Sequence, residues 1–281
     1  MKAHFFDIDT ILVIDGKVWI VDKNKPNIPI MKISKADFNL IKSGIYKSQG
    51  NYLDFGGHTY WLPTELMEKV KIKSKTYKAN ITDLAFSLQE FMNKDLIENI
   101  DYDINVDSLL HLKNTTDDIY VICSKNNKKN YELMISKIED KLIHNGLKVK
   151  KYYFISETFY NRDSDEVSHK KVRLLLQHLI GFKTEGDKFI DEKLEQYDEV
   201  HFYDDEFESI KLSKDCNKLL MFLISNTETN LKSTIKDVLK QKQITLFVNL
   251  VTGNKVNKLE TTKVALEYSN LIKVFESFKW R

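Results

Sequence analysis

The N-terminal segment His4-Phe5-Phe6-Asp7-Ile8-Asp9-Thr10-Ile11-Leu12-Val13 places two carboxylates one residue apart at the end of a short apolar run. In a β-strand this spacing sends both side chains to the same face. Two like charges this close raise each other's proton affinity, so the pair is stable as a dianion only beside a cation or several donors. The pair therefore indicates a metal-binding or catalytic site, or else a strand end that runs into a solvated turn.

The composition is that of a soluble globular protein. The chain has 281 residues, which is long enough for one large domain or a domain with an insertion. Its residues are 42% hydrophobic and 30% charged, as is usual for globular proteins. No apolar run approaches the roughly 20 residues that span a membrane, and no signal peptide precedes the first strand, so we expect a cytoplasmic protein with no membrane partner. Cys123 and Cys216 are too few for a disulfide framework. The net charge of +2 and a general bias toward lysine give little weight to nucleic-acid binding.

Strand and helix patterns alternate along the chain. After the opening strand, apolar runs predict further strands at 118–124, 151–156, 199–203 and 244–250. Helical spacing predicts helices at about 129–144, 168–180, 212–224, 231–240 and 264–278, with weak helix at 188–196. This alternation is typical of an α/β fold with right-handed crossovers. We expect a parallel sheet of about five strands with helices on both faces.

The segment between the first two core strands has a different character. Lys17-Val18-Trp19-Ile20-Val21 follows the turn signal Asp15-Gly16 and predicts a strand in a small hairpin. Residues 24–63 hold all three prolines and many aromatic side chains, which indicates a β-rich excursion rather than a linker. Residues 82–93 have helical spacing. We therefore assign 14–115 to an insertion, and 1–13 with 116–281 to the core domain.

Residues with catalytic chemistry follow the predicted core strands. In parallel sheets ligands collect beyond the carboxyl ends of the strands. Four carboxylates meeting there need a hard divalent cation, and oxygen ligands favour Mg²⁺ over zinc. A hydroxyl, a lysine and a metal together suit a phosphoryl group, and a carboxylate can attack phosphorus to form an aspartyl-phosphate. The residues concerned are Asp7 and Asp9, Ser124, the pair Asp204-Asp205, and Lys170-Lys171 at the start of a helix.

Taken in order, these motifs resemble the haloacid dehalogenase (HAD) superfamily of aspartate-nucleophile phosphatases. The family's four motifs are an apolar strand with Asp-x-Asp, a strand ending in Thr or Ser, a Lys at a helix start, and a strand ending in paired acids. They match Phe6-Asp7-Ile8-Asp9, Val121-Ile122-Cys123-Ser124, Lys170-Lys171 and Phe202-Tyr203-Asp204-Asp205. The resemblance covers the five-strand framework, implies a HAD-like Rossmann-type fold, and leaves 14–115 and about 207–243 unmatched. On this basis 14–115 is expected to form a β-rich flap or cap.

The resemblance implies a role for each matched residue. Asp7 would be the nucleophile, and Asp9 the acid that protonates the leaving oxygen and then the base that activates water. Ser124 would hold the phosphoryl oxygens. Mg²⁺ would be bound by Asp7, the backbone carbonyl of Asp9, and Asp204 or Asp205. Lys171 would neutralise the phosphate and the nucleophile.

Lys171 is preferred because residues 171–179 resemble the corresponding helix in the phosphatase domain of polynucleotide kinase/phosphatases, although Lys170 stays a candidate. The expected substrate is a phosphorylated small molecule, a nucleotide or the terminal phosphate of a nucleic acid. One departure is Thr10-Ile11, where the family usually has Gly and then Thr or Val. Thr10 and the unmatched segments keep open a second hypothesis, in which a weakly active or inactive HAD-like scaffold binds a protein or nucleic acid.

Several other residues are better explained without a catalytic role. His58 is expected at a surface turn, and His169 has no visible partner. Thr252-Gly253-Asn254 is expected to be a plain turn. The aromatic residues of 38–61 could stack on a nucleobase, but packing within a small sheet explains them more simply.

Overall fold

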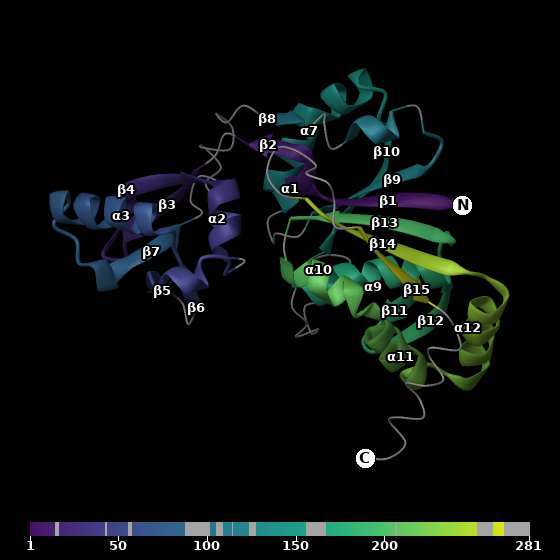
Figure 1. The fold of residues 1–281 in the computed structure, drawn as a ribbon. Helices are drawn as coiled ribbons and strands as arrows, with labels where there is room; N and C mark the ends of the chain where they lie inside the picture. Colours follow the sequence, from purple (N-terminus) through teal and green to yellow (C-terminus); the bar gives the residue numbers. More distant parts are fainter. Residues whose placement is uncertain are drawn as a thin grey trace, which may run out of the picture. The chain divides into compact units, whose positions relative to one another are not determined.

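The computed structural model describes residues 1–14, 17–42, 44–55, 58–87, 102–104, 109–113, 115–123, 128–155, 167–205, 207–251 and 261–266. The chain divides into two compact units, each described here by itself (Figure 1). Unit 1 contains Met1–Leu12, Ile104–Tyr131 and Glu139–Arg281. Unit 2 contains Val13–Asp103 and Glu132–Ile138.

Unit 1 is built on a six-stranded, mostly parallel sheet. Its strand order is β10 (Val149–Phe154), β9 (Asp118–Cys123), β1 (Lys2–Asp7), β13 (Glu199–Asp204), β14 (Ile244–Leu250), β15 (Thr261–Leu266). The first five strands are parallel to one another and are the five strands predicted from the apolar runs. The sixth strand, β15, pairs antiparallel with β14. The helix predicted at 264–278 is therefore wrong at 264–266, and its remainder lies outside the described residues.

One face of this sheet carries the main hydrophobic core. Strand side chains alternate between the two faces, so Phe5, Phe202 and Val248 point to the same side and are each 0% exposed. They pack in one cluster with apolar residues of four helices. These helices are α9 (Val167–Ile180), α10 (Phe207–Lys214), α11 (Cys216–Asn226) and α12 (Thr229–Gln241). The sequence analysis expected helices on both faces of the sheet, and for the opposite face this stays a prediction.

The carboxyl end of α9 is defined by a glycine in the sequence. Helix α9 confirms the helix predicted at 168–180. Gly181 ends the helix with φ +84°, a left-handed conformation that glycine adopts without a Cβ clash. Its N–H donates to the carbonyl of Gln177 at 2.7 Å, which satisfies one of the helix's last carbonyl groups.

Unit 2 has its own small core. The antiparallel sheet β4-β3-β7 consists of β3 (Lys17–Asp22), β4 (Lys25–Ser34) and β7 (Leu84–Ser87). A separate hairpin joins β5 (Tyr52–Phe55) to β6 (His58–Trp61), and the unit also contains α2 (Lys35–Lys42) and α3 (Thr64–Thr76). Val18, Ile20 and Val70 lie at the centre of its hydrophobic cluster and are each 0% exposed. The β-rich segment predicted at 24–63 thus contains β4, β5 and β6, but also α2.

Two local helix predictions are wrong, and one strand prediction is confirmed with a different partner than its turn signal suggested. The helix expected at 82–93 begins instead as the 3-10 turn η2 (Ile81–Asp83) and strand β7, and 88–93 lie outside the described residues. The weak helix expected at 188–196 is strand β12 (Lys188–Lys193), which pairs with β11 (Phe182–Glu185). The strand predicted at 17–21 is confirmed as β3, but its partners are β4 and β7 rather than the chain before Asp15.

The remaining elements are short, apart from one long helix. They are α1 (Ile8–Ile11), β2 (Leu12–Ile14) paired with β8 (Tyr102–Ile104), η1 (Lys47–Gln49), η3 (Leu110–Leu112) and α7 (Lys128–His144). Helix α7 confirms the helix predicted at 129–144. Among the described helices, none has the length and apolar character needed to cross a membrane.

Candidate functional site

The carboxyl ends of β1 and β13 bring two of the predicted carboxylates together. Phe6 pairs with Tyr203 in the parallel register, so the next residues, Asp7 and Asp204, end adjacent strands. Both are buried, with exposed fractions of 1% and 0%. The strand register alone therefore places two acidic side chains at one edge of the sheet.

A buried lysine joins these two carboxylates. Lys171 lies in the first turns of α9 and is 0% exposed. Its Nζ lies 2.9 Å from Asp7 Oδ1 and 2.8 Å from Asp204 Oδ2. The neighbouring Lys170 is partly exposed. Of the two candidate lysines, the structure thus brings Lys171 to the predicted acidic residues.

A third carboxylate completes an acidic group. One oxygen from each of Asp7, Asp204 and Asp205 lies within 4.8 Å of the others. Asp205 is partly exposed, whereas the other two are buried. The three carboxylates and the Lys171 ammonium form one compact charged group. All-oxygen donors of this kind fit a hard divalent cation such as Mg²⁺.

The turn after β1 orients the second aspartate of the pair. We expected Asp9 to lie in the first strand. Instead β1 ends at Asp7, and Asp9 lies in the single helical turn α1 that follows directly. Its backbone N–H donates to Asp7 Oδ2 at 3.2 Å. The hydroxyl of Thr10 donates to the Asp7 carbonyl at 2.7 Å and is buried. Thr10, the departure from the family pattern, therefore stabilises this turn through the backbone.

Cys123 is a neighbour of the acidic group for which the sequence suggested no role beyond packing. Cys123 ends β9 and is 0% exposed. Burial, together with the charges of Asp7 and Asp9, raises the pKa of the Cys123 thiol above its ordinary range. A thiol held protonated in this way is a poor nucleophile. Cys123 is therefore not a candidate nucleophile of this group.

The remaining residues considered from the sequence do not add to this group. Ser124 and the turn Thr252-Gly253-Asn254 lie outside the described residues, so the role expected for Ser124 stays a prediction. His58 is exposed at the start of β6 in unit 2, and His169 is partly buried on α9. Of the aromatic residues of 38–61, Phe38 and Tyr60 pack into the core of unit 2, as the simpler explanation predicted.

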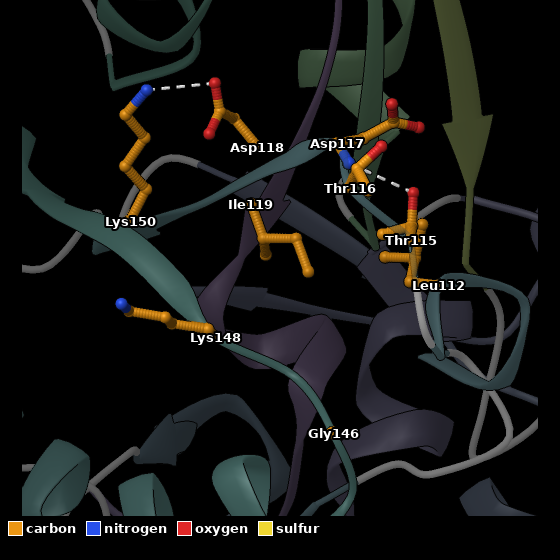
Figure 2. Close-up of a pocket in the computed structure, with 9 residues that line it drawn as sticks. All are labelled: Leu112, Thr115, Thr116, Asp117, Asp118, Ile119, Gly146, Lys148 and Lys150. Carbon is orange, nitrogen blue, oxygen red and sulfur yellow. Dashed lines mark hydrogen bonds and ion pairs between the residues drawn. The ribbon is translucent and has the colours of Figure 1, made fainter.

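A hollow lies at the amino ends of strands β9 and β10, opposite to the carboxyl ends that carry the acidic group. It has a volume of about 390 Å³ and is lined by the first residues of β9, by the start of β10 and by the chain before each of them (Figure 2). Lys150 and Asp118 form an ion pair of 2.9 Å across it. Asp118 also accepts a hydrogen bond of 2.6 Å from the buried Tyr197 hydroxyl. Asp118 and Lys150 therefore offset each other's charge within this hollow.

A polar network that no sequence pattern indicated crosses the sheet face opposite the main core. His111 Nε2 and the Tyr203 hydroxyl are 2.9 Å apart, and His4 lies 3.3 Å from the same hydroxyl and from Asp117. The His4 and His201 rings stack with centroids 4.8 Å apart. Burial and the neighbouring His201 lower the pKa of His4 to about 4. The strand alternation could have revealed this face, since these side chains share the parity of Phe6.

Comparisons with known proteins identify no relative. No protein-family model, no curated protein and no solved structure matches the chain.

Proposed function

We propose that the protein is a Mg²⁺-dependent phosphomonoester hydrolase of the HAD-like type. The observation that carries the proposal is the buried contact of Lys171 with both Asp7 and Asp204 at the carboxyl ends of adjacent parallel strands. The three groups come from three separate parts of the chain: the Lys171 ammonium lies within hydrogen-bonding distance of the carboxylates of Asp7 and Asp204. A phosphoryl-transfer site needs this combination of a nucleophile and fixed positive charge.

The proposed reaction has two steps. An oxygen of Asp7 attacks phosphorus, and the bond from phosphorus to the leaving oxygen breaks as Asp9 donates its proton to that oxygen. Asp9 then takes a proton from water, the resulting hydroxide attacks the aspartyl-phosphate, and inorganic phosphate leaves with Asp7 restored. General acid and base catalysis of this kind contributes about 10²- to 10⁴-fold to the rate.

The remaining groups position and neutralise. Lys171 offsets the charge of Asp7 and of the phosphoryl oxygens, and Ser124 is proposed to hold one of those oxygens. Asp7, Asp204 and Asp205 would hold Mg²⁺, together with the Asp9 carbonyl. When bound, Mg²⁺ supplies positive charge that offsets the charge on the transferred phosphoryl group.

The fold supports the same proposal in outline. Five parallel strands with the acidic residues at their carboxyl edge agree with a Rossmann-type α/β sheet. We further propose that 14–115 acts as the cap of a HAD-like core and that the substrate is a nucleotide or a nucleic-acid terminal phosphate. The second candidate function is a HAD-like scaffold that binds a protein or nucleic acid without turnover.

A substrate screen separates the two candidates. Purified protein is incubated with phosphorylated metabolites, nucleotides and oligonucleotide 3′-phosphates, with Mg²⁺ or with a chelator, and released phosphate is measured. The hydrolase proposal expects turnover that requires Mg²⁺. No turnover of any substrate favours the scaffold.

Paired variants test the mechanism residue by residue. Asp7→Asn removes the nucleophile and is expected to abolish turnover, so full activity in this variant would refute the mechanism. Asp9→Asn is expected to lower kcat by about 10²-fold or more. Lys171→Met and Lys170→Met form a matched pair on consecutive residues, of which Lys171 is buried beside the carboxylates and Lys170 is partly exposed. We expect a large loss of turnover only for Lys171→Met.

A further inference from the structure

Helix α3 in unit 2 presents a run of exposed lysines. Residues 69–78 contain five lysines and no acidic residue. All five side chains are exposed, and the run continues past the helix end at Thr76. The helix packs against β4 through its other face, where Met67, Val70 and Ser74 are buried. We call Lys69, Lys71, Lys73, Lys75 and Lys78, with Tyr77, the α3 lysine surface.

The positive charge is local to this surface. Residues 69–78 contain five lysines and no acidic residue, whereas unit 2 as a whole contains fourteen lysines and thirteen acidic residues, a net charge of +1. The rest of the chain also has a net charge of +1. The local excess on α3, and not the charge of the whole unit, therefore fits a polyanion.

The ammonium groups of these lysines make no ion pair with the described residues. Among the described residues, no ion pair or side-chain hydrogen bond involves the ammonium groups of the α3 lysine surface. In contrast, Lys150 and Lys171 of unit 1 each contact two carboxylates. Interaction with the carboxyl end of a helix accounts for lysines in the last turn, such as Lys73 and Lys75. It does not account for Lys69 or for Lys78 beyond the end.

Lys78 occupies a position that favours glycine. Its φ is +55°, and its N–H donates to the Lys75 carbonyl at 3.2 Å, while the Ala79 N–H donates to the Ser74 carbonyl at 2.9 Å. This is the Schellman arrangement of a helix end, in which the left-handed residue is usually glycine. A lysine there strains the backbone, so its charge is not explained by helix stability.

The neighbouring apolar side chains distinguish between polyanions. Tyr77 is 45% exposed beside the lysines, and Ile72 is 66% exposed on the same helix. A helix that binds a membrane surface needs a broad exposed apolar face, and the apolar face of α3 is buried in the unit. Exposed lysines on both sides of the helix beside one open aromatic ring suit a flexible single strand, whose phosphates can contact the lysines and whose unpaired bases can stack.

We propose that the α3 lysine surface binds single-stranded nucleic acid, with the lysines on successive backbone phosphates and Tyr77 stacked on a base. This site is separate from the proposed phosphatase chemistry and does not depend on it. Binding is measured on the full chain in a chelating buffer, so that turnover cannot consume the ligand.

Fluorescence anisotropy of a labelled oligothymidylate of about 20 nucleotides tests the proposal. The variant Lys71→Gln/Lys73→Gln/Lys75→Gln is expected to weaken binding roughly tenfold or more at low salt, and to reduce the slope of log Kd against log salt by about 2. The matched control Lys148→Gln/Lys211→Gln/Lys218→Gln removes the same charge from exposed positions of unit 1. Its expected loss is less than about threefold. Equal losses in the two variants would overturn the proposal.

Two single variants and two competitors sharpen the result. Tyr77→Ala is expected to weaken binding about fivefold or more through loss of stacking. Lys78→Gly is expected to raise the thermal midpoint while lowering affinity, because glycine relieves the left-handed strain. A merely structural Lys78 would not lower the affinity. No binding of the oligonucleotide, or tighter binding to anionic lipid vesicles or to an acidic peptide, would refute the proposal.

Discussion

Replacing Lys171 by methionine tests whether the carboxylates of the acidic group are ionised while they are buried from solvent. The lysine and both of its partners are almost completely buried, with Nζ–O distances of 2.9 and 2.8 Å. At an effective dielectric constant near 20, each contact contributes an attraction of about 6 kcal/mol before desolvation is counted. Removing the ammonium leaves two buried carboxylates facing each other. Loss of one partner from a buried ion pair costs about 3–5 kcal/mol, and we expect a loss of this size at pH 7.

Scanning calorimetry in a chelating buffer measures this loss. For a unit of this size, 1 kcal/mol corresponds to roughly 2–4 °C in the thermal midpoint, so the unit 1 transition should fall by about 10 °C. The deficit should shrink at about pH 5, since a carboxylate that has lost its cation takes up a proton more readily. Added Mg²⁺ should also raise the midpoint of the variant, by binding the carboxylates left behind.

The matched control is Lys170→Met, one residue earlier on the same helix. Lys170 is partly exposed, so its replacement should change stability by less than about 0.5 kcal/mol. If Lys171→Met is no more destabilising than Lys170→Met, Lys171 does not neutralise two buried charges. The electrostatic basis of the proposed site would then be wrong.

Two further predictions concern stability alone. Burial lowers the pKa of both His4 and His178 to about 4 from 6.5, so the unfolded chain binds more protons between these values. The free energy of unfolding should be highest above about pH 6.5 and fall by about 3 kcal/mol per histidine as the pH drops to about 4. A free energy of unfolding that does not change over this pH range would contradict the prediction. Gly181→Ala should cost about 1–2 kcal/mol, because φ is +84° and the new Cβ would lie 3.1 Å from Gln196 Cβ. The loss should exceed that of Gly44→Ala, where φ is +73° but no atom lies within 4 Å.

The central strands could be predicted because both of their faces are buried. Residues 118–123 and 244–250 read as nearly continuous apolar runs, and both are confirmed as parallel strands. Because the carboxyl ends of parallel strands lie at one edge of a sheet, the sequence predicted Asp7 and Asp204 at the same edge. That their strands, β1 and β13, are direct neighbours is known only from the structure.

The edge strand β15 could not be predicted in the same way. Thr261–Leu266 is a short segment whose apolar residues fit a helical pattern as well as a strand. Its conformation depends on hydrogen bonds to β14, which are tertiary contacts that no local pattern encodes. Residues 84–87 were assigned to a helix for the same reason, and they pair with β3 instead.

The choice between Lys170 and Lys171 also required the structure. Consecutive residues on a helix point about 100° apart, so a register error of one residue exchanges a buried side chain for a solvated one. Helix α9 offers no clear polar face to fix this register, because every residue from 171 to 180 is buried. Three of its polar side chains are held inside by specific partners: Arg173 by Gly186 and Asp187, Gln177 by Thr184, and His178 by Tyr153.

The two polar groups of unit 1 differ in the kind of ligand that they suit. At the amino ends of the strands, Lys150 contacts Asp118 and Glu195, and Tyr197 donates to Asp118, so these charges and hydrogen bonds offset one another. At the carboxyl ends, Lys171 contacts Asp7 and Asp204, and a buried ion pair of this kind is usually no more stable than apolar side chains of similar size. Stability therefore gives no reason for Lys171 to be buried between Asp7 and Asp204. Under the proposed function the carboxylate oxygens of Asp7, Asp204 and Asp205, which lie within 4.8 Å of one another, give a chemical reason, because all-oxygen donors suit a divalent cation.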